Sequence, residues 1–155
     1  MSLPGRRQTH FIVVHCSATP PESDIGADEI NSWHLDRGFD EIGYHAVIRR
    51  TGLIEFGRHF DVAGAHVRGS NFKSVGVCLV GGVDAYGEAE NNFTAPQFKS
   101  LGAILILLSR AYPDAQVVGH RDLSPDINGD GVVTTDEFIK ECPSFDVQEW
   151  IDEQT

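Results

Sequence analysis

Residues 11–16 read Phe-Ile-Val-Val-His-Cys, an apolar run with β-branched side chains that ends in a histidine and a cysteine. A run of this kind is typical of a buried β-strand. Side chains alternate between the two faces of a strand, so His15 and Cys16 should point in opposite directions. We therefore expect a buried strand that carries His15 at its carboxyl end, and we do not expect His15 and Cys16 to bind one metal ion together.

The rest of the chain alternates between segments with strand and helix patterns. We expect further strands at residues 44–50, 53–58, 74–80 and 116–118, helices at 27–37, 95–111 and from 144 or 146 to 150, and a helical turn at 135–139. Thr94 and Pro96 indicate the start of the longest helix, because Thr caps helix N-termini and Pro fits their first turn. The pattern predicts an α/β (mixed α+β) fold, with one domain built on a central mixed sheet of about five strands flanked by helices.

The composition of the chain argues against several kinds of partner and location. The chain has 155 residues, a net charge of -11 and an isoelectric point of about 4.9, which argues against a nucleic-acid partner, since phosphate binding requires a basic face. No apolar run approaches the roughly 18 residues of a membrane span, so we expect no membrane partner. The polar N-terminal segment predicts no signal peptide, and three cysteines without a disulfide framework favour a reduced, cytoplasmic protein.

Three residues with metal-binding side chains lie at, or just beyond, the ends of expected strands: His15, His120 and Cys142. Imidazole nitrogen and thiolate sulfur are ligands that zinc prefers. A hydrolytic zinc site needs three protein ligands and one open position for water. The spacing alone is equally compatible with two hydrogen-bonded histidines and a buried thiol.

Residues 126–137 read Asp-Ile-Asn-Gly-Asp-Gly-Val-Val-Thr-Thr-Asp-Glu, which matches the twelve-position EF-hand calcium loop. Gly131 falls at the sharp turn of that pattern. The expected calcium ligands are Asp126, Asn128, Asp130, the carbonyl of Val132, Thr134 and Glu137. Ser124-Pro125 precedes the loop, so we expect a single structural site without a normal entering helix. The alternative is an acidic, glycine-rich surface turn.

Five blocks of sequence point to a known family: residues 11–19 (Phe-Ile-Val-Val-His-Cys-Ser-Ala-Thr), 43–45 (Gly-Tyr-His), 64–71 (Gly-Ala-His-Val-Arg-Gly-Ser-Asn), 74–82 (Ser-Val-Gly-Val-Cys-Leu-Val-Gly-Gly) and 140–146 (Lys-Glu-Cys-Pro-Ser-Phe-Asp). Together they resemble the type 2 N-acetylmuramoyl-L-alanine amidases, a family that includes amidase-type phage lysozymes and peptidoglycan recognition proteins. The resemblance extends from about residue 11 to 150. It implies one amidase domain over 1–155, with a core at about 10–151 and a calcium-loop insertion at about 124–139.

The resemblance also implies roles for individual residues. Zinc would be held by His15, His120 and Cys142, the catalytic side chains would be Tyr44 and Lys140, and the substrate groove would contain His45, His66 and Asn71. Tyr44 could hydrogen-bond the attacking water, and Lys140 could offset the negative charge that develops on the oxygen of the scissile carbonyl. The alternatives are a packed aromatic for Tyr44, a solvated surface lysine for Lys140 and a core residue for His45, since alternation turns it away from Tyr44.

The activity that the resemblance implies is hydrolysis of the amide between N-acetylmuramic acid and L-alanine in peptidoglycan, during phage or prophage lysis. A holin-like partner or cell lysis would release the enzyme to the cell wall, and we expect a monomer. Calcium would order the insertion and so position Lys140 and Cys142. One rival is a non-catalytic peptidoglycan-binding module, although such members typically lack the cysteine ligand. Another is a regulator, since a phage member of the family inhibits RNA polymerase, but no segment of this chain indicates that surface.

Overall fold

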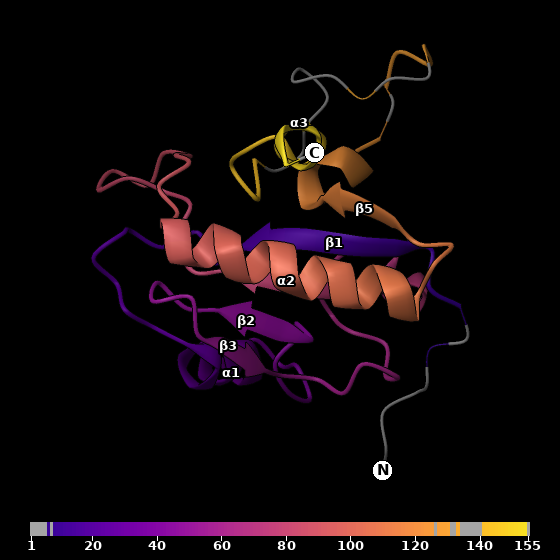
Figure 1. The fold of residues 1–155 in the computed structure, drawn as a ribbon. Coiled ribbons are helices and arrows are strands. Elements are labelled where there is room, and N and C mark those ends of the chain that lie inside the picture. Colours follow the sequence, from indigo (N-terminus) through magenta and orange to yellow (C-terminus); the bar gives the residue numbers. More distant parts are fainter. Residues whose placement is uncertain (1–5, 7, 126, 131–132, 134–140, 155) are drawn as a thin grey trace.

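The computed structural model describes residues 6, 8–125, 127–130, 133 and 141–154 (Figure 1). Its centre is a five-stranded sheet in the order β3-β2-β4-β1-β5. The strands are β1 (Phe11–Cys16), β2 (Ala46–Ile48), β3 (Ile54–Phe56), β4 (Ser74–Leu79) and β5 (Gln116–Gly119). β1 runs parallel to both β4 and β5, β2 runs parallel to β4, and β3 is antiparallel to β2. The predicted mixed sheet of about five strands within one α/β domain is therefore confirmed.

In the described residues, three α-helices accompany the sheet: α1 (Ala27–Asp36), α2 (Ala95–Ala111) and α3 (Val147–Glu153). Two short 3₁₀ helices, η1 (Asn71–Lys73) and η2 (His120–Leu123), precede β4 and follow β5. The bounds of α2 are those that the sequence predicts. Thr94 accepts a hydrogen bond from the Gln97 amide at 3.2 Å, and the Gln97 side chain accepts one from the Thr94 amide at 2.9 Å.

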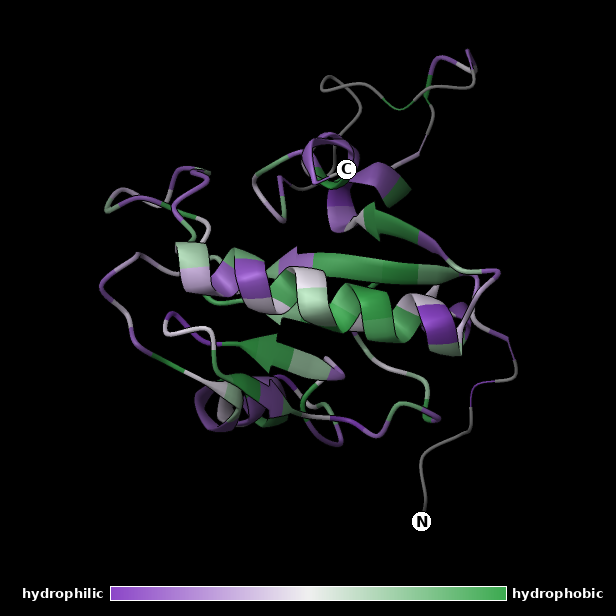
Figure 2. Cartoon of the chain, viewed as in Figure 1, coloured by the Kyte–Doolittle hydropathy of each residue, from purple (hydrophilic) through white to green (hydrophobic). Residues whose placement is uncertain are grey.

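Alternation divides the buried residues between two faces of the sheet. On the face covered by α2, which we call the α2 face, Ile12 and Val14 of β1 and Val75 and Val77 of β4 pack with Leu101 and its neighbours. On the opposite face, which we call the α1 face, Val47 and Cys78 cluster with Ile30 of α1. Figure 2 shows hydrophobic residues concentrated along β1 and β2.

Several elements differ in length from the sequence-based expectation: β2 and β3 are each at least three residues shorter, α3 is longer at its C-terminal end, and α1, β4 and β5 differ by one residue. β2 is shorter than predicted, but the amide of His45 still donates to the Gly76 carbonyl at 2.9 Å, so the chain stays beside β4 before the regular ladder begins. α3 continues to Glu153 and begins after Asp146, whose carboxylate accepts from the Glu149 amide at 2.8 Å. The predicted turn at 135–139 lies outside the described residues. Within the described part of the chain, every helix is too short or too polar to cross a membrane.

Candidate active site

His15, His120 and Cys142 meet at one edge of the sheet. β1 and β5 are adjacent parallel strands, so their carboxyl ends bring together His15, in β1, and His120, which opens η2 directly after β5. The Sγ atom of Cys142 lies 3.8 Å from Nδ1 of His15, and the ring centroids of His15 and His120 are 4.6 Å apart. One ligand atom from each of the three residues lies within 4.8 Å of the others. The fold thus assembles from three distant segments the group that the sequence predicts.

Backbone hydrogen bonds attach the segment of Cys142 to the sheet. The Arg121 amide donates to the Cys142 carbonyl at 2.8 Å, and the Cys16 amide donates to Cys142 Sγ at 3.1 Å. The hydroxyl of Ser144 donates to the Gly82 carbonyl at 2.8 Å. These bonds fix the position of the sulfur relative to β1. The thiol of Cys16, 4.0 Å from Ser144 Oγ, is not one of the three grouped residues.

The thiols of Cys16 and Cys142 shift each other's acidity in opposite directions. The Cys142 side chain lowers the pKa of Cys16 to about 7, against the opposing effect of burial. The Cys16 side chain, together with burial, raises the pKa of Cys142 well above its usual value. A metal ion requires the thiolate of Cys142, so binding would release this proton.

The three ligand side chains fit a zinc ion. Two imidazoles and one thiolate form a borderline-soft donor set, and three protein ligands leave a fourth tetrahedral position open. Zinc–ligand distances of about 2.0–2.3 Å place the ligand atoms of a tetrahedral site roughly 3.5 Å apart. The 3.8 Å between His15 Nδ1 and Cys142 Sγ is close to that separation.

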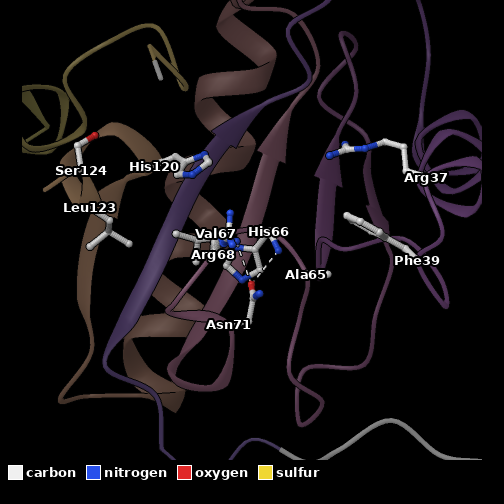
Figure 3. A pocket seen from close by; sticks show the side chains of 10 residues that line it. All are labelled: Arg37, Phe39, Ala65, His66, Val67, Arg68, Asn71, His120, Leu123 and Ser124. Atoms are coloured by element: carbon white, nitrogen blue, oxygen red, sulfur yellow. Dashed lines mark hydrogen bonds between the residues drawn. The ribbon is translucent and has the colours of Figure 1, made fainter. Parts of the chain in front are cut away.

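Two pockets adjoin the three ligands. The smaller, of about 260 Å³, is lined by all three together with Tyr44 and His34. The larger, of about 710 Å³, is lined by Arg37, Phe39, Ala65, His66, Val67, Arg68, Asn71, His120, Leu123 and Ser124 (Figure 3). The two pockets are neighbours, because Arg37, Phe39, Ala65, His66 and His120 line both, and the ligand group lies in the smaller one.

Tyr44 lies beside the ligand group, with its ring centroid 5.1 Å from that of His15. Burial raises the pKa of Tyr44 well above 10, and the neighbouring thiol groups, Cys78 first, raise it further. At neutral pH Tyr44 therefore remains a phenol, which can donate a hydrogen bond but cannot act as a base.

The three residues predicted for substrate binding occupy different environments. Asn71 lines the larger pocket, and its side-chain oxygen accepts from the amides of His66 and Val67 at 2.9 Å each. His66 also lines the pocket and is 9% exposed. Figure 3 shows Asn71 beneath His66, with both bonds drawn.

His45 is 0% exposed and lines neither pocket, so its predicted contact with substrate does not fit this structure. Its Nε2 donates to the Val62 carbonyl at 2.8 Å, and its Nδ1 accepts from the Gly76 amide at 3.0 Å. Burial lowers its pKa to about 4, so the ring is neutral and both nitrogens are satisfied. The physical reason is the alternation noted from the sequence, which turns His45 into the protein while Tyr44 faces the site.

The sequence did not single out Arg37, Phe39 and Arg68, which line the larger pocket. The Arg37 guanidinium lies 5.1 Å from the Phe39 ring centroid. Neither arginine forms an ion pair within the part of the chain that the structure describes. Basic residues are common in the last turn of a helix, so the position of Arg37 did not indicate a binding role. Arg68 lies in the same sequence block as His66 and Asn71, and nothing in that block distinguished it.

Several predicted site residues lie outside the described residues: the catalytic candidate Lys140 and the calcium candidates Asp126, Val132, Thr134 and Glu137. Of the expected loop, Asn128 and Asp130 are described. Both are exposed, and the Asp130 amide donates to the Asn128 side-chain oxygen at 3.0 Å. The roles of Lys140 and of the calcium loop remain predictions.

Comparison with known proteins identifies the family. Residues 5–137 match the family model described as N-acetylmuramoyl-L-alanine amidase. The chain therefore belongs to this family, as its sequence blocks predict, and is an amidase. The match ends before Cys142, so the placement of that ligand rests on the geometry described above.

Similar proteins of known identity include phage endolysins. The chain is 44% identical to the endolysin of Enterobacteria phage K11 over 146 residues, which cover 94% of this chain and 87% of the relative. It is 40% identical to the endolysin of Escherichia phage T7 over 145 residues, with the same coverage of 94% and 87%. The solved structure of the N-acetylmuramoyl-L-alanine amidase LysC from Clostridium intestinale URNW matches with a TM-score of 0.77 and 25% identity, over 99% of this chain and 89% of that one.

Proposed function

We propose that this amidase is a zinc-dependent endolysin that hydrolyses the amide between the lactyl group of N-acetylmuramic acid and L-alanine in peptidoglycan. The observation that carries the proposal is the position of the group formed by His15, His120 and Cys142, in a pocket of about 260 Å³ that adjoins a larger one of about 710 Å³. The family and the endolysin relatives support the substrate class.

When bound at these ligands, zinc lowers the pKa of water to about 7 and polarises the carbonyl that is attacked. The protein supplies the geometry around that chemistry. Tyr44 presents a protonated phenol beside His15, suited to hydrogen-bond the attacking water or the developing tetrahedral centre. Lys140, two positions before Cys142 in the sequence, would offset negative charge on the former carbonyl oxygen.

The charge of the larger pocket suits an acidic peptide. The chain carries a net charge of -11, yet the charged residues described along this pocket are Arg37 and Arg68. We propose that they bind a carboxylate of the stem peptide and so orient the scissile amide toward the ligand group. Guanidinium groups are well suited to this task because they bind carboxylates in a bidentate manner.

We further propose a single domain with a calcium-binding insertion at residues 124–139. The side-chain oxygens of Asn128 and Asp130 would contribute to it, and the ion would order the segment that leads to Lys140 and Cys142. The enzyme would act as a monomer, accumulate in the cytoplasm and reach the cell wall after a holin-like partner or cell lysis releases it.

Metal content and dye release from labelled peptidoglycan, measured together, test the proposal. We expect one zinc per wild-type chain, and loss of both zinc and dye release in Cys142→Ser. His59→Ala is the matched control, because His59 is an exposed histidine outside both pockets.

Two outcomes contradict the proposal. Dye release that persists in Cys142→Ser without zinc would exclude zinc dependence. A wild-type protein that binds both zinc and peptidoglycan but releases no dye would instead identify a recognition module.

A further inference from the structure

A chain of buried hydrogen bonds runs from the protein interior to the candidate zinc ligand His15. The hydroxyl of Ser74 lies 2.7 Å from the Ser70 carbonyl and 3.2 Å from Nε2 of His66. Nδ1 of His66 lies 2.8 Å from Nε2 of His15. On its other side, Nδ1 of His15 lies 3.8 Å from Cys142 Sγ.

The direction of each hydrogen bond follows from the first acceptor. A carbonyl oxygen can only accept, so the single hydroxyl proton of Ser74 is directed to Ser70. Ser74 Oγ must then accept from Nε2–H of His66, which leaves Nδ1 of a neutral His66 as an acceptor. That acceptor takes the Nε2–H of His15. Nδ1 of His15 therefore keeps a lone pair, on the side that faces Cys142.

Packing holds the His66 ring in this orientation. The ring lies against two glycines, where a side chain would collide with it. A Cβ atom at Gly76 would lie 2.7 Å from Cγ and Nδ1 of His66, and one at Gly64 would lie 2.5 Å from its Cδ2. The rings of His15 and His66 meet edge to face, at 88° with centroids 4.9 Å apart. The position of His66 is thus determined from several sides before any ligand binds.

We propose that His66 is a positioning residue for the metal centre: it fixes His15 in the Nε2–H tautomer and aims Nδ1 of His15 at the ion. The inference rests on the proposed zinc dependence, and it revises the substrate-binding role expected for His66. Both ring nitrogens of His66 are hydrogen-bonded within the protein, so neither is available to bind a substrate. Partners of this kind fix the tautomer and orientation of metal-binding histidines and are typically worth about 10–100-fold in metal affinity.

The test is zinc affinity, measured by competition with a chromogenic chelator, for His66→Phe and His66→Asn in the full chain. We expect His66→Phe to weaken binding about 10–100-fold. His66→Asn should recover part of that loss, because its side-chain oxygen can replace Nδ1 as the acceptor. His59→Phe is the control for the loss of a histidine, since His59 is an exposed residue that lies outside both pockets and outside the ligand group.

Ser74 gives an independent variant that leaves both rings in place. Ser74→Ala removes the acceptor for His66 Nε2–H and should weaken zinc binding in the same direction, whereas Ser74→Thr keeps the hydroxyl and should restore it. If His66→Phe does not fold, this pair still decides the question. Equal zinc affinity in Ser74→Ala and wild type, with melting temperatures confirming a folded protein, would overturn the proposal.

Nitrogen-15 NMR of the histidine rings tests the tautomer without metal or activity. In the zinc-free protein we expect His15 to be in the Nε2–H form, and to become a mixture of tautomers in Ser74→Ala. A wild-type protein that binds no zinc but shows this fixed tautomer would contradict the zinc proposal and leave the hydrogen-bond assignment standing. A protein that binds zinc but shows His15 in the Nδ1–H form before zinc is added would reject the role of His66 alone.

Discussion

The two faces of the sheet are formed by the same strands but have different roles. On the α2 face, β1 and β4 contribute Val14, Val75 and Val77 to an apolar core with Leu101. On the α1 face, β1 contributes His15, and β4 contributes Ser74, Gly76 and Cys78 near the candidate active site. Residues that are neighbours in one strand therefore have different environments: one packs in the apolar core, and the next lies among hydrogen-bonded side chains near the site. The comparison predicts that substitutions on the two faces separate stability from activity.

The largest effect should follow from His15→Ala on the α1 face. The variant loses one of three ligands, and metal-assisted chemistry contributes several kcal/mol to lowering the barrier, so we expect activity to fall by at least about 10³-fold. Dye release from labelled peptidoglycan and zinc content measure this loss. The two-face comparison fails if the variant keeps more than a tenth of wild-type activity, or if it does not fold.

Leu101→Ala on the α2 face should have the converse effect. Leu101 is 0% exposed, and truncation of such a residue costs about 2–5 kcal/mol of unfolding free energy. Below the melting transition, activity and zinc content per folded molecule should stay at wild-type levels. Urea denaturation and dye release measure the two quantities. A selective loss of zinc would show that the faces are coupled.

Gly76→Ala tests whether packing on the α1 face sets the ligand geometry. Its new methyl group would lie 2.7 Å from His66, and overpacking of this kind costs about 1–3 kcal/mol. We expect a lower melting temperature and, because the His66 ring must move, weaker zinc binding. Gly102→Ala is the control. Gly102 lies on α2, and its new methyl group would have its nearest contact, with Trp150, at 3.9 Å. Equal zinc affinities in the two variants would argue against this mechanism.

Arg68→Glu should weaken substrate binding by about tenfold in KM, because it replaces an attraction to a carboxylate with a repulsion. The zinc content should not change, since Arg68 lies outside the ligand group. Arg110→Glu on α2 makes the same change of charge away from the pocket and serves as the control. If both variants respond alike, the effect comes from net charge, and Arg68 has no specific role.

The smallest effect should come from the calcium loop. Without Asp130 the loop loses one carboxylate ligand, so calcium should raise the melting temperature of wild type by a few degrees and that of Asp130→Ala by less. Asp152→Ala, a carboxylate in α3, is the control. Asp126→Ala extends the test to the first loop position. If calcium shifts wild type and both loop variants equally, or not at all, the insertion is an acidic turn.

The sequence predicts most of the framework because its signals are local. The apolar run at 11–16 and the cap at Thr94 lead directly to β1 and α2. The ligand group is different, because His15 and Cys142 come together only through tertiary structure, and spacing alone left two readings open. Resemblance to a family resolved that ambiguity. It could not reveal the role of His66, which depends on the direction of hydrogen bonds, nor the exclusion of His45, which depends on its burial.

The separation of the ligands along the chain has a consequence for folding. His15 and Cys142 are 127 positions apart, so an ion bound to both closes a loop that contains β2, β3, β4 and β5. In the chain-entropy model, a cross-link over about 100 residues restricts the unfolded chain enough to stabilise the native state by roughly 4.7 kcal/mol. Bound zinc would then act as a reversible cross-link between the N-terminal and C-terminal parts of the fold. Unfolding would have to release it, and resistance to denaturation would rise with the concentration of free zinc.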